Sequence, residues 1–119
     1  MEQFIGTLFH SRTQAHVAHL QVQSYAAHKA LNEYYDAIVD KVDELAEAYQ
    51  GRYGIIMGYK IPGTKDMADP KAIVAYFETL SKFVMAKRKK LPQDPCLQAL
   101  VDEIQLLIDS TLYKLKFLK

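Results

Sequence analysis

Apolar residues recur every three or four positions in four separate segments of the chain. This spacing is typical of helices with one buried face, and strands would instead alternate apolar and polar positions. Two segments fill the first half, at about residues 3–22 and 25–53, and two more begin at Pro70 and Pro95. The pattern therefore predicts an all-α chain with four helices.

Prolines and glycines indicate where these helices begin and end. All four prolines and four of the five glycines lie between Gly51 and Pro95, which leaves long uninterrupted segments on either side. Ser24 precedes the second helix as a good N-cap residue. Asp-Pro pairs at 69–70 and 94–95 place an N-cap residue and a first-turn proline before the third and fourth helices. The third helix ends in the sequence KRKK, whose cations suit the negative end of a helix dipole.

Each predicted helix has one face that is expected to pack in the core. The first carries Ile5, Leu8, Phe9, Arg12, His16, His19 and Leu20 on one side. The second has the apolar stripe Leu31, Ile38, Val42, Leu45 and Tyr49. The third has Ile73, Val74, Phe77, Leu80, Phe83 and Val84, and the fourth has Leu97, Leu100, Val101, Ile104, Leu107, Ile108, Leu112 and Leu115.

The lengths of the connections predict the topology. Very short breaks join the first helix to the second and the third to the fourth, so each pair forms an antiparallel hairpin. The sequence IIMGYKIPGTKDMAD, residues 55–69, separates the two hairpins. Fifteen extended residues reach about 50 Å, whereas a helix of 20 residues is about 30 Å long. We therefore expect residues 1–119 to form one ferritin-like four-helix-bundle domain, two hairpins joined by a long crossover. The alternative is a loose insertion between adjacent helices.

Composition narrows the partners of this chain. Its 119 residues are 50% hydrophobic, carry a net charge of +1 and include one cysteine, Cys96. No internal disulfide is possible, and no apolar run approaches the ~20 residues of a membrane span. A cytoplasmic protein without a membrane partner is expected. Binding to nucleic acid is expected only as nonspecific contact between the basic run at 82–90 and phosphate groups.

A row of polar residues on the second predicted helix is the main candidate for chemistry. Counting about 100° per residue, Asn32, Asp36, Asp43 and Glu47 fall within about 100° of His28, beside the apolar stripe rather than opposite it. A simple solvated face would lie on the far side. The row either borders a second subunit or forms the outer rim of a monomer.

Residues 12–54 resemble the first two helices of Dps proteins, the small ferritin-like iron-storage proteins that coat DNA in starved bacteria. The resemblance rests on histidine and acid spacing and on the sequence VDELAE at 42–47. It implies a site between two subunits that binds iron, with zinc or no metal as alternatives, and a ferroxidase activity. The ligands that it implies are His16, His28, Asn32, Asp43 and Glu47. Asn32 stands where the family has aspartate, which removes a negative charge from each site and leaves the enzymatic activity uncertain.

Stretches throughout the chain also resemble small uncharacterised proteins of tailed bacteriophages, especially those of marine cyanobacteria. They are IGTLFHSRTQAHVAHLQ, YQGRYGIIMGYKIPG and STLYKLKF. This resemblance favours a phage origin and leaves open a second function, a metal-free structural or interaction protein. The two resemblances together imply a location in the cytoplasm of a bacterium or an infected host cell. Either function predicts a homo-oligomer, at least a dimer, associated through the first two helices. His19 is expected to pack in the core, or else to substitute as a ligand.

Overall fold

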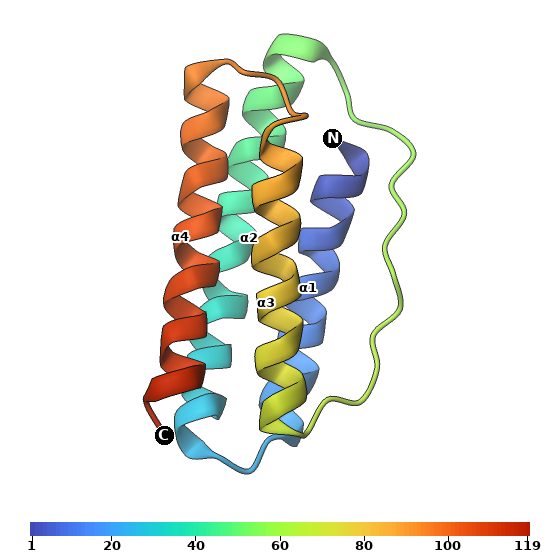
Figure 1. The fold of residues 1–119 in the computed structure, drawn as a ribbon. Coiled ribbons are helices and arrows are strands. Elements are labelled where there is room, and N and C mark those ends of the chain that lie inside the picture. Colours follow the sequence, from blue (N-terminus) through green and yellow to red (C-terminus); the bar gives the residue numbers. More distant parts are fainter.

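The computed structural model describes all residues, 1–119, as four helices without any strand (Figure 1). Their bounds are α1 Glu2–Gln21, α2 Tyr25–Tyr53, α3 Pro70–Arg88 and α4 Pro95–Phe117. The predicted all-α class is confirmed, and the starts of the last three helices fall where the sequence placed them. No helix has the length and apolar character that a membrane crossing requires.

Local capping explains where the helices begin. The Ser24 side chain accepts a hydrogen bond from the Ala27 backbone N–H, and Asp69 accepts one from Lys71 N–H, so both cap free amides at helix starts. Asp94 precedes α4, but its carboxylate binds the end of α2 instead. It accepts hydrogen bonds from the Tyr53 hydroxyl at 2.6 Å and from the Arg52 guanidinium at 3.0 Å.

The helices form two antiparallel hairpins, α1–α2 and α3–α4 (Figure 1). Helix α2 packs against α1 and α4, α4 also packs against α3, and α1 touches α3 only slightly. Residues 54–69, which we call the strap, leave α2 at one end of the bundle and reach α3 at the opposite end (Figure 1). The strap passes along the outside of α1.

Side chains of α1 fix the strap in place, so a loose insertion does not describe it. The Gln14 side chain donates to the Lys65 carbonyl at 2.8 Å and accepts from the Lys65 N–H at 3.1 Å. Gln21 accepts from the Met67 N–H at 2.7 Å. Gly6 lies directly under the strap, because a β-carbon there would be 2.5 Å from the Lys60 carbonyl oxygen.

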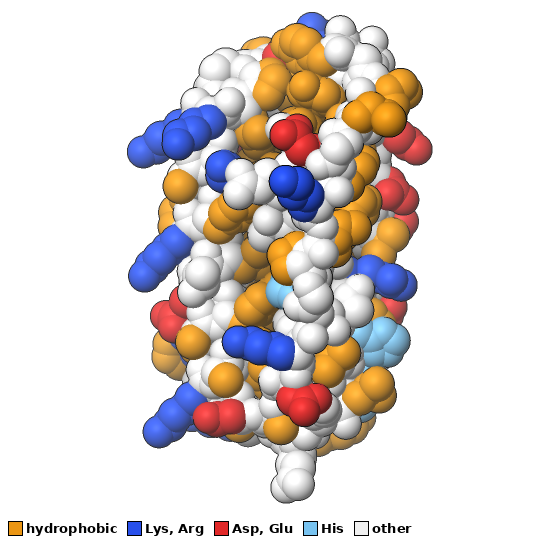
Figure 2. Space-filling view, turned by 90° about the vertical axis from the view of Figure 1, so that its right-hand side faces the viewer, with side chains coloured by type: hydrophobic (Ala, Val, Ile, Leu, Met, Phe, Trp, Pro, Cys, Tyr) orange, Lys and Arg blue, Asp and Glu red, His pale blue; other side chains and the backbone are white.

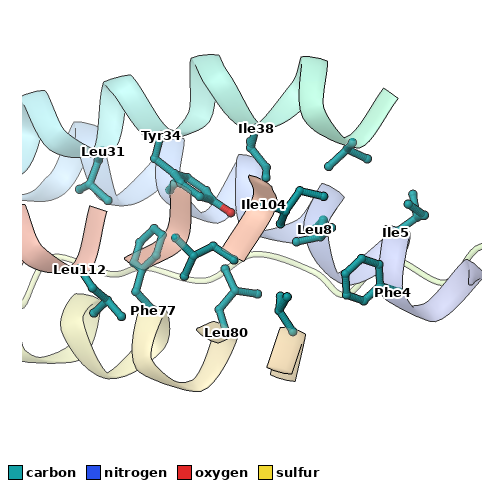
Figure 3. Close-up of a cluster of buried hydrophobic side chains, with 14 of the residues drawn as sticks. Phe4, Ile5, Leu8, Leu31, Tyr34, Ile38, Phe77, Leu80, Ile104 and Leu112 are labelled. Carbon is teal, nitrogen blue, oxygen red and sulfur yellow. The ribbon is translucent and has the colours of Figure 1, made fainter. Parts of the chain in front are cut away.

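The core lies between the four helices and includes most of the predicted apolar residues (Figure 3). Leu31, Ile38, Val42 and Leu45 are buried as expected, whereas Tyr49 is only half-buried. Tyr34 is also fully buried, although the apolar stripe did not include it. Its hydroxyl lies 2.7 Å from that of Ser11, which donates to the Leu8 carbonyl, so both buried hydroxyls are hydrogen-bonded.

Helix α1 buries a different face from the predicted one. Arg12, His16 and Leu20 are exposed, and Leu20 is 71% accessible. The buried residues are Phe4, Ile5, Gly6, Leu8, Ser11, Gln14, Ala15, Ala18 and His19. Ser11, Ala15 and Ala18 are small, which lets α1 approach the rest of the bundle closely. Gln14 and His19 are buried through their hydrogen bonds to the strap and to the start of α2.

Candidate functional site on the α1–α2 face

The five predicted metal ligands all lie on α1 and α2, but their environments differ. His16 is exposed on α1, and its ring stacks on Tyr35 of α2 with centroids 4.2 Å apart and planes at 14°. His28 and Asn32 are half-buried, while Asp43 and Glu47 are exposed further along α2. No group of three or more His, Cys, Asp or Glu side chains within the chain could hold a metal ion together. A site shared between two subunits therefore stays a prediction.

His28 pairs with His19, not with His16. The two rings stack with centroids 3.6 Å apart and planes at 19°. His19 Nδ1 lies 2.7 Å from the His28 carbonyl oxygen, and His28 Nδ1 lies 2.8 Å from the His19 carbonyl oxygen. A carbonyl oxygen only accepts, so each Nδ1 carries a proton and donates it to the carbonyl of the other residue. The expectation that His19 packs in the core is borne out, because it is 7% exposed.

Sequence reasoning missed this reciprocal pair, although one signal was present. His19 and His28 stand at equal distances from residues 23–24, at the turn between two antiparallel helices. A residue near the end of α1 lies beside a residue near the start of α2, so each imidazole reaches the other backbone. The pair closes the end of the hairpin.

Asn32 is engaged within its own helix. Its side-chain N–H donates to an Asp36 carboxylate oxygen at 2.8 Å, and its carbonyl oxygen accepts from the Tyr35 hydroxyl at 3.0 Å. Tyr35 in turn supports the exposed His16 ring. Asn32 thus positions the aromatic group on this face, a role that does not require a metal.

A ridge of carboxylates follows the outer side of α2. We define this acidic ridge as Asp36, Asp40, Asp43, Glu44 and Glu47, all of which are exposed. None of them takes part in an ion pair of the structure. Viewed from the strap side, acidic groups gather toward one edge of the molecule and basic groups toward the other (Figure 2). The α1–α2 face therefore presents uncompensated negative charge.

An apolar groove runs between α1 and α2 beside this ridge. It has a volume of about 240 Å³ and is lined by Leu8, Phe9, Arg12, Ile38, Val39 and Val42. Arg12 is the one charged residue of the lining, and it also has no carboxylate partner. Phe9 continues the apolar surface to the strap through Tyr59, with ring centroids 5.8 Å apart. The face thus combines an open apolar centre with a positive rim on α1 and a negative rim on α2.

Comparison with known proteins gives this chain a family. The model of DUF5856, a family of unknown function, matches residues 19–115. The chain belongs to the DUF5856 family. The matched region of this DUF5856 protein includes the His19–His28 pair, the acidic ridge, all of α2 and α3, and α4 as far as Leu115.

A viral relative accompanies the family match. The DUF5856 chain is 25% identical over 103 residues to an uncharacterised 14.6 kDa protein of Enterobacteria phage T4, from the mobD-ri intergenic region. The match covers 87% of this chain and 77% of the T4 protein. No solved structure matches the chain significantly. The predicted similarity to uncharacterised phage proteins is supported, and the resemblance to Dps proteins stays a prediction.

Proposed function

We propose that this chain is a phage-encoded interaction protein that self-associates through its α1–α2 face. The observation that carries the proposal is the apolar groove between Arg12 on one rim and the acidic ridge on the other. Exposed apolar surface bounded by charged groups is typical of protein interfaces.

A second copy of the chain suits this face because α1 contributes the cation Arg12 to it and α2 contributes the acidic ridge. In a twofold dimer the same patch is used on both subunits, and α1 of one copy can lie against α2 of the other. Arg12 of each copy would then face the acidic ridge of the other copy, so the same contact would occur twice in the dimer. Charged rims of this kind steer association and fix its register more than they add affinity.

The proposed scaffold has the ferritin-like topology. Support comes from the two antiparallel hairpins and from the strap that joins opposite ends of the bundle (Figure 1). Ferritin-like folds have one such long connection, whereas an up-down-up-down bundle has only short loops. The phage origin is supported by the similarity to the T4 protein.

Self-association is tested by sedimentation velocity over a range of protein concentrations. Val39→Glu places a charge in the groove and is expected to weaken association by about tenfold or more, because a buried charge without a partner is unfavourable. Ala48→Glu is the matched control, since it is exposed on α2 and lies nine residues further on, about 180° around the helix. A chain that is monomeric at every concentration, or equal behaviour of the two variants, refutes the proposal.

A second candidate function is Dps-like iron binding between two subunits. The observation that favours it is the state of His28, whose Nδ1 proton is held by the His19 carbonyl. Histidines that bind metals commonly donate their other ring N–H to such an acceptor, which leaves Nε2 free for the ion. The proposed ligands are His16 and His28, with Asp43 and Glu47 from the partner and Asn32 as a weak neutral ligand. Imidazole and carboxylate groups suit ferrous iron.

Metal binding is tested by thermal unfolding with and without Zn(II), and with Fe(II) under anaerobic conditions. Binding to the folded state alone raises Tm as the metal concentration increases. Asp43→Asn is expected to remove this rise, whereas Asp40→Asn, exposed on the same helix, is expected to keep it. No rise in Tm for the unmodified protein refutes metal binding and leaves the self-association proposal untouched.

A further inference from the structure

Helix α4 carries an apolar stripe on its outer side. Leu106, Tyr113 and Phe117 are 68%, 53% and 71% exposed, and Ser110 between them is also exposed. The steps from Leu106 to Ser110, Tyr113 and Phe117 are four, three and four residues, which is the spacing of a coiled-coil seam. The outer side of a helix in a monomer is normally polar, so the stripe is suited to another helix.

Ion pairs border the stripe on both sides. Toward α2, Lys114 binds Glu33 at 2.7 Å and Glu103 binds Lys41 at 3.8 Å. Toward α3, Arg88 binds Asp102 at 2.6 Å and Lys116 binds Glu78 at 3.2 Å. These pairs hold the flanking charges in place, but they leave the side chains of Glu103 and Asp102 52% and 51% exposed. The charged groups are therefore still available to a neighbour.

The charges of α4 are segregated along its length. The acidic residues Asp102, Glu103 and Asp109 all precede Ser110, and the basic residues of the helix, Lys114 and Lys116, follow it. Two such helices side by side in parallel would place like charges together. In the antiparallel orientation the acidic half of each helix lies against the basic half of the other. Charges that flank a coiled-coil seam set the orientation of the helices in this way.

We propose that the outer face of α4 is a second self-association surface, on which α4 of another copy packs antiparallel about a twofold axis. Leu106 lies opposite the partner's Phe117, and Ser110 lies opposite the partner's Tyr113. This register also brings Asp109 close to the partner's Lys116, because both lie on the α3 edge of the stripe, where Asp109 accepts a hydrogen bond from Ser81 and Lys116 pairs with Glu78. By symmetry the contact occurs twice. Every apolar residue of the stripe then meets an apolar or small residue.

A surface groove receives the largest side chain in this arrangement. Lys41, Glu103, Leu106, Leu107 and Ser110 line a groove of about 410 Å³ between α2 and α4. Because it adjoins Leu106, the partner's Phe117 enters it. Ser110, at the middle of the stripe, has a small side chain and lets the two helices approach closely.

This surface uses different residues from the α1–α2 groove, because Leu106, Tyr113 and Phe117 lie on α4 and none of them lines that groove. A chain with two separate twofold surfaces can join more than two copies. Association through α4 alone covers only about 17 Å of helix, at 1.5 Å per residue. Small interfaces of this kind are typical of weak complexes, so high protein concentrations are required.

The decisive experiment mixes two charge variants. Asp109→Lys opposes a lysine to the partner's Lys116, and Lys116→Asp opposes an aspartate to the partner's Asp109. Each single variant is expected to associate about tenfold or more weakly than the unmodified chain in sedimentation velocity. An equimolar mixture of the two restores both attractive pairs and is expected to recover association. Recovery in the mixture also excludes misfolding as the cause of the loss.

A second pair of variants tests the apolar stripe. Leu106→Glu is expected to weaken α4 association, and Ala86→Glu, exposed on α3, is expected to leave it unchanged. If either charge variant associates as strongly as the unmodified chain, or if the mixture fails to recover, the proposal is wrong. Val39→Glu acts on the other face, so loss of association in that variant alone supports the α1–α2 dimer and overturns the α4 surface.

Discussion

Gly6 and Lys60 are in direct contact across the boundary between α1 and the strap, although 54 positions separate them in the sequence. A β-carbon at position 6 would lie 2.5 Å from the Lys60 carbonyl oxygen and 3.4 Å from the Lys60 carbonyl carbon. Backbone atoms cannot move aside as the end of a flexible side chain can. Gly6 is therefore required by the path of the strap, even though glycine inside a helix is unfavourable.

Gly6→Ala is expected to destabilise the protein by about 1–3 kcal/mol, because the added methyl group displaces the strap. Gly51→Ala is the matched control, since Gly51 is also helical and nothing lies within 4 Å of its added β-carbon. The control is expected to stabilise by about 0.5–1 kcal/mol through helix propensity. Urea unfolding measures both changes. Equal effects at the two sites would contradict the close approach of the strap.

The reciprocal pair at the hairpin turn gives a second prediction. His28→Ala removes the ring stack and the hydrogen bond to the His19 carbonyl, and we expect a loss of about 1–2 kcal/mol in unfolding free energy. His28→Asn is expected to recover part of the loss, because its side-chain N–H can reach the same carbonyl. His16→Ala, at an exposed position, serves as the control and should change stability by less than about 0.5 kcal/mol. A large effect of His16→Ala would indicate that the pairing is wrong.

The buried hydroxyls of Ser11 and Tyr34 are expected to behave as a unit. Burial raises the pKa of Tyr34, so its hydroxyl stays protonated and requires a partner. Ser11→Ala leaves that hydroxyl without its partner and should cost about 1–3 kcal/mol.

The double-mutant cycle with Tyr34→Phe measures this coupling. Because Tyr34→Phe removes the group that Ser11→Ala would strand, the double variant is expected to be no less stable than Ser11→Ala alone. Chemical denaturation of all four proteins gives the coupling energy. Additive losses would show that the two hydroxyls do not interact.

His10 predicts a dependence of stability on pH. Burial lowers the pKa of His10 below its ordinary value of 6.5, and the charge of Lys65 lowers it further, while a hydrogen bond with the Gly63 backbone opposes the shift. Nδ1 of the same ring lies 3.1 Å from the Tyr76 hydroxyl. As pH falls below 6.5, the unfolded chain takes up a proton at His10 before the folded chain does. The contribution of neutral His10 to the free energy of unfolding is therefore present above pH 6.5. It is lost as pH falls through the lower pKa that His10 has in the folded protein.

His10→Asn cannot titrate but can still accept a hydrogen bond from Tyr76. The decrease in unfolding free energy between pH 7 and 5 is expected to be smaller in this variant than in the unmodified protein. His16→Asn, at an exposed site, should leave the decrease unchanged. Denaturation at several pH values measures the slopes, and equal slopes for all three proteins would contradict the prediction.

The sequence predicted the helices because their boundaries depend on local chemistry. Ser24 and Asp69 define two helix starts by capping, and Pro70 and Pro95 favour the first turns of α3 and α4, with no reference to the rest of the fold. That Asp94 would bind α2 rather than cap α4 was not visible in the sequence. The buried stripe of α2 could be predicted in the same way, since Leu31, Ile38, Val42 and Leu45 follow the helical period. The crossing of the strap from one end of the bundle to the other was predicted from the length of this connection.

The contacts between elements were harder to predict. A glutamine on a helix surface is usually solvated, so Gln14 gave no sign that it holds the strap through both of its amide atoms. His16 was placed with His28 through the resemblance to Dps proteins, whereas the rotation of α1 puts His19 there instead. That rotation follows from the small buried residues Ala15 and Ala18. The prediction chose a different face because it gave more weight to larger apolar residues such as Leu20.

The packing of α2 between α1 and α4 has a consequence for synthesis on the ribosome. Its two neighbours are translated at different times, because α1 precedes it whereas α4 follows only after the strap and α3. Until Phe117 has left the exit tunnel, the apolar side chains of the α1–α2 hairpin that pack against α4 stay exposed. The core is therefore completed only once α4 has emerged, and a chain truncated within α4 is expected to expose this apolar surface and aggregate rather than form a smaller stable protein.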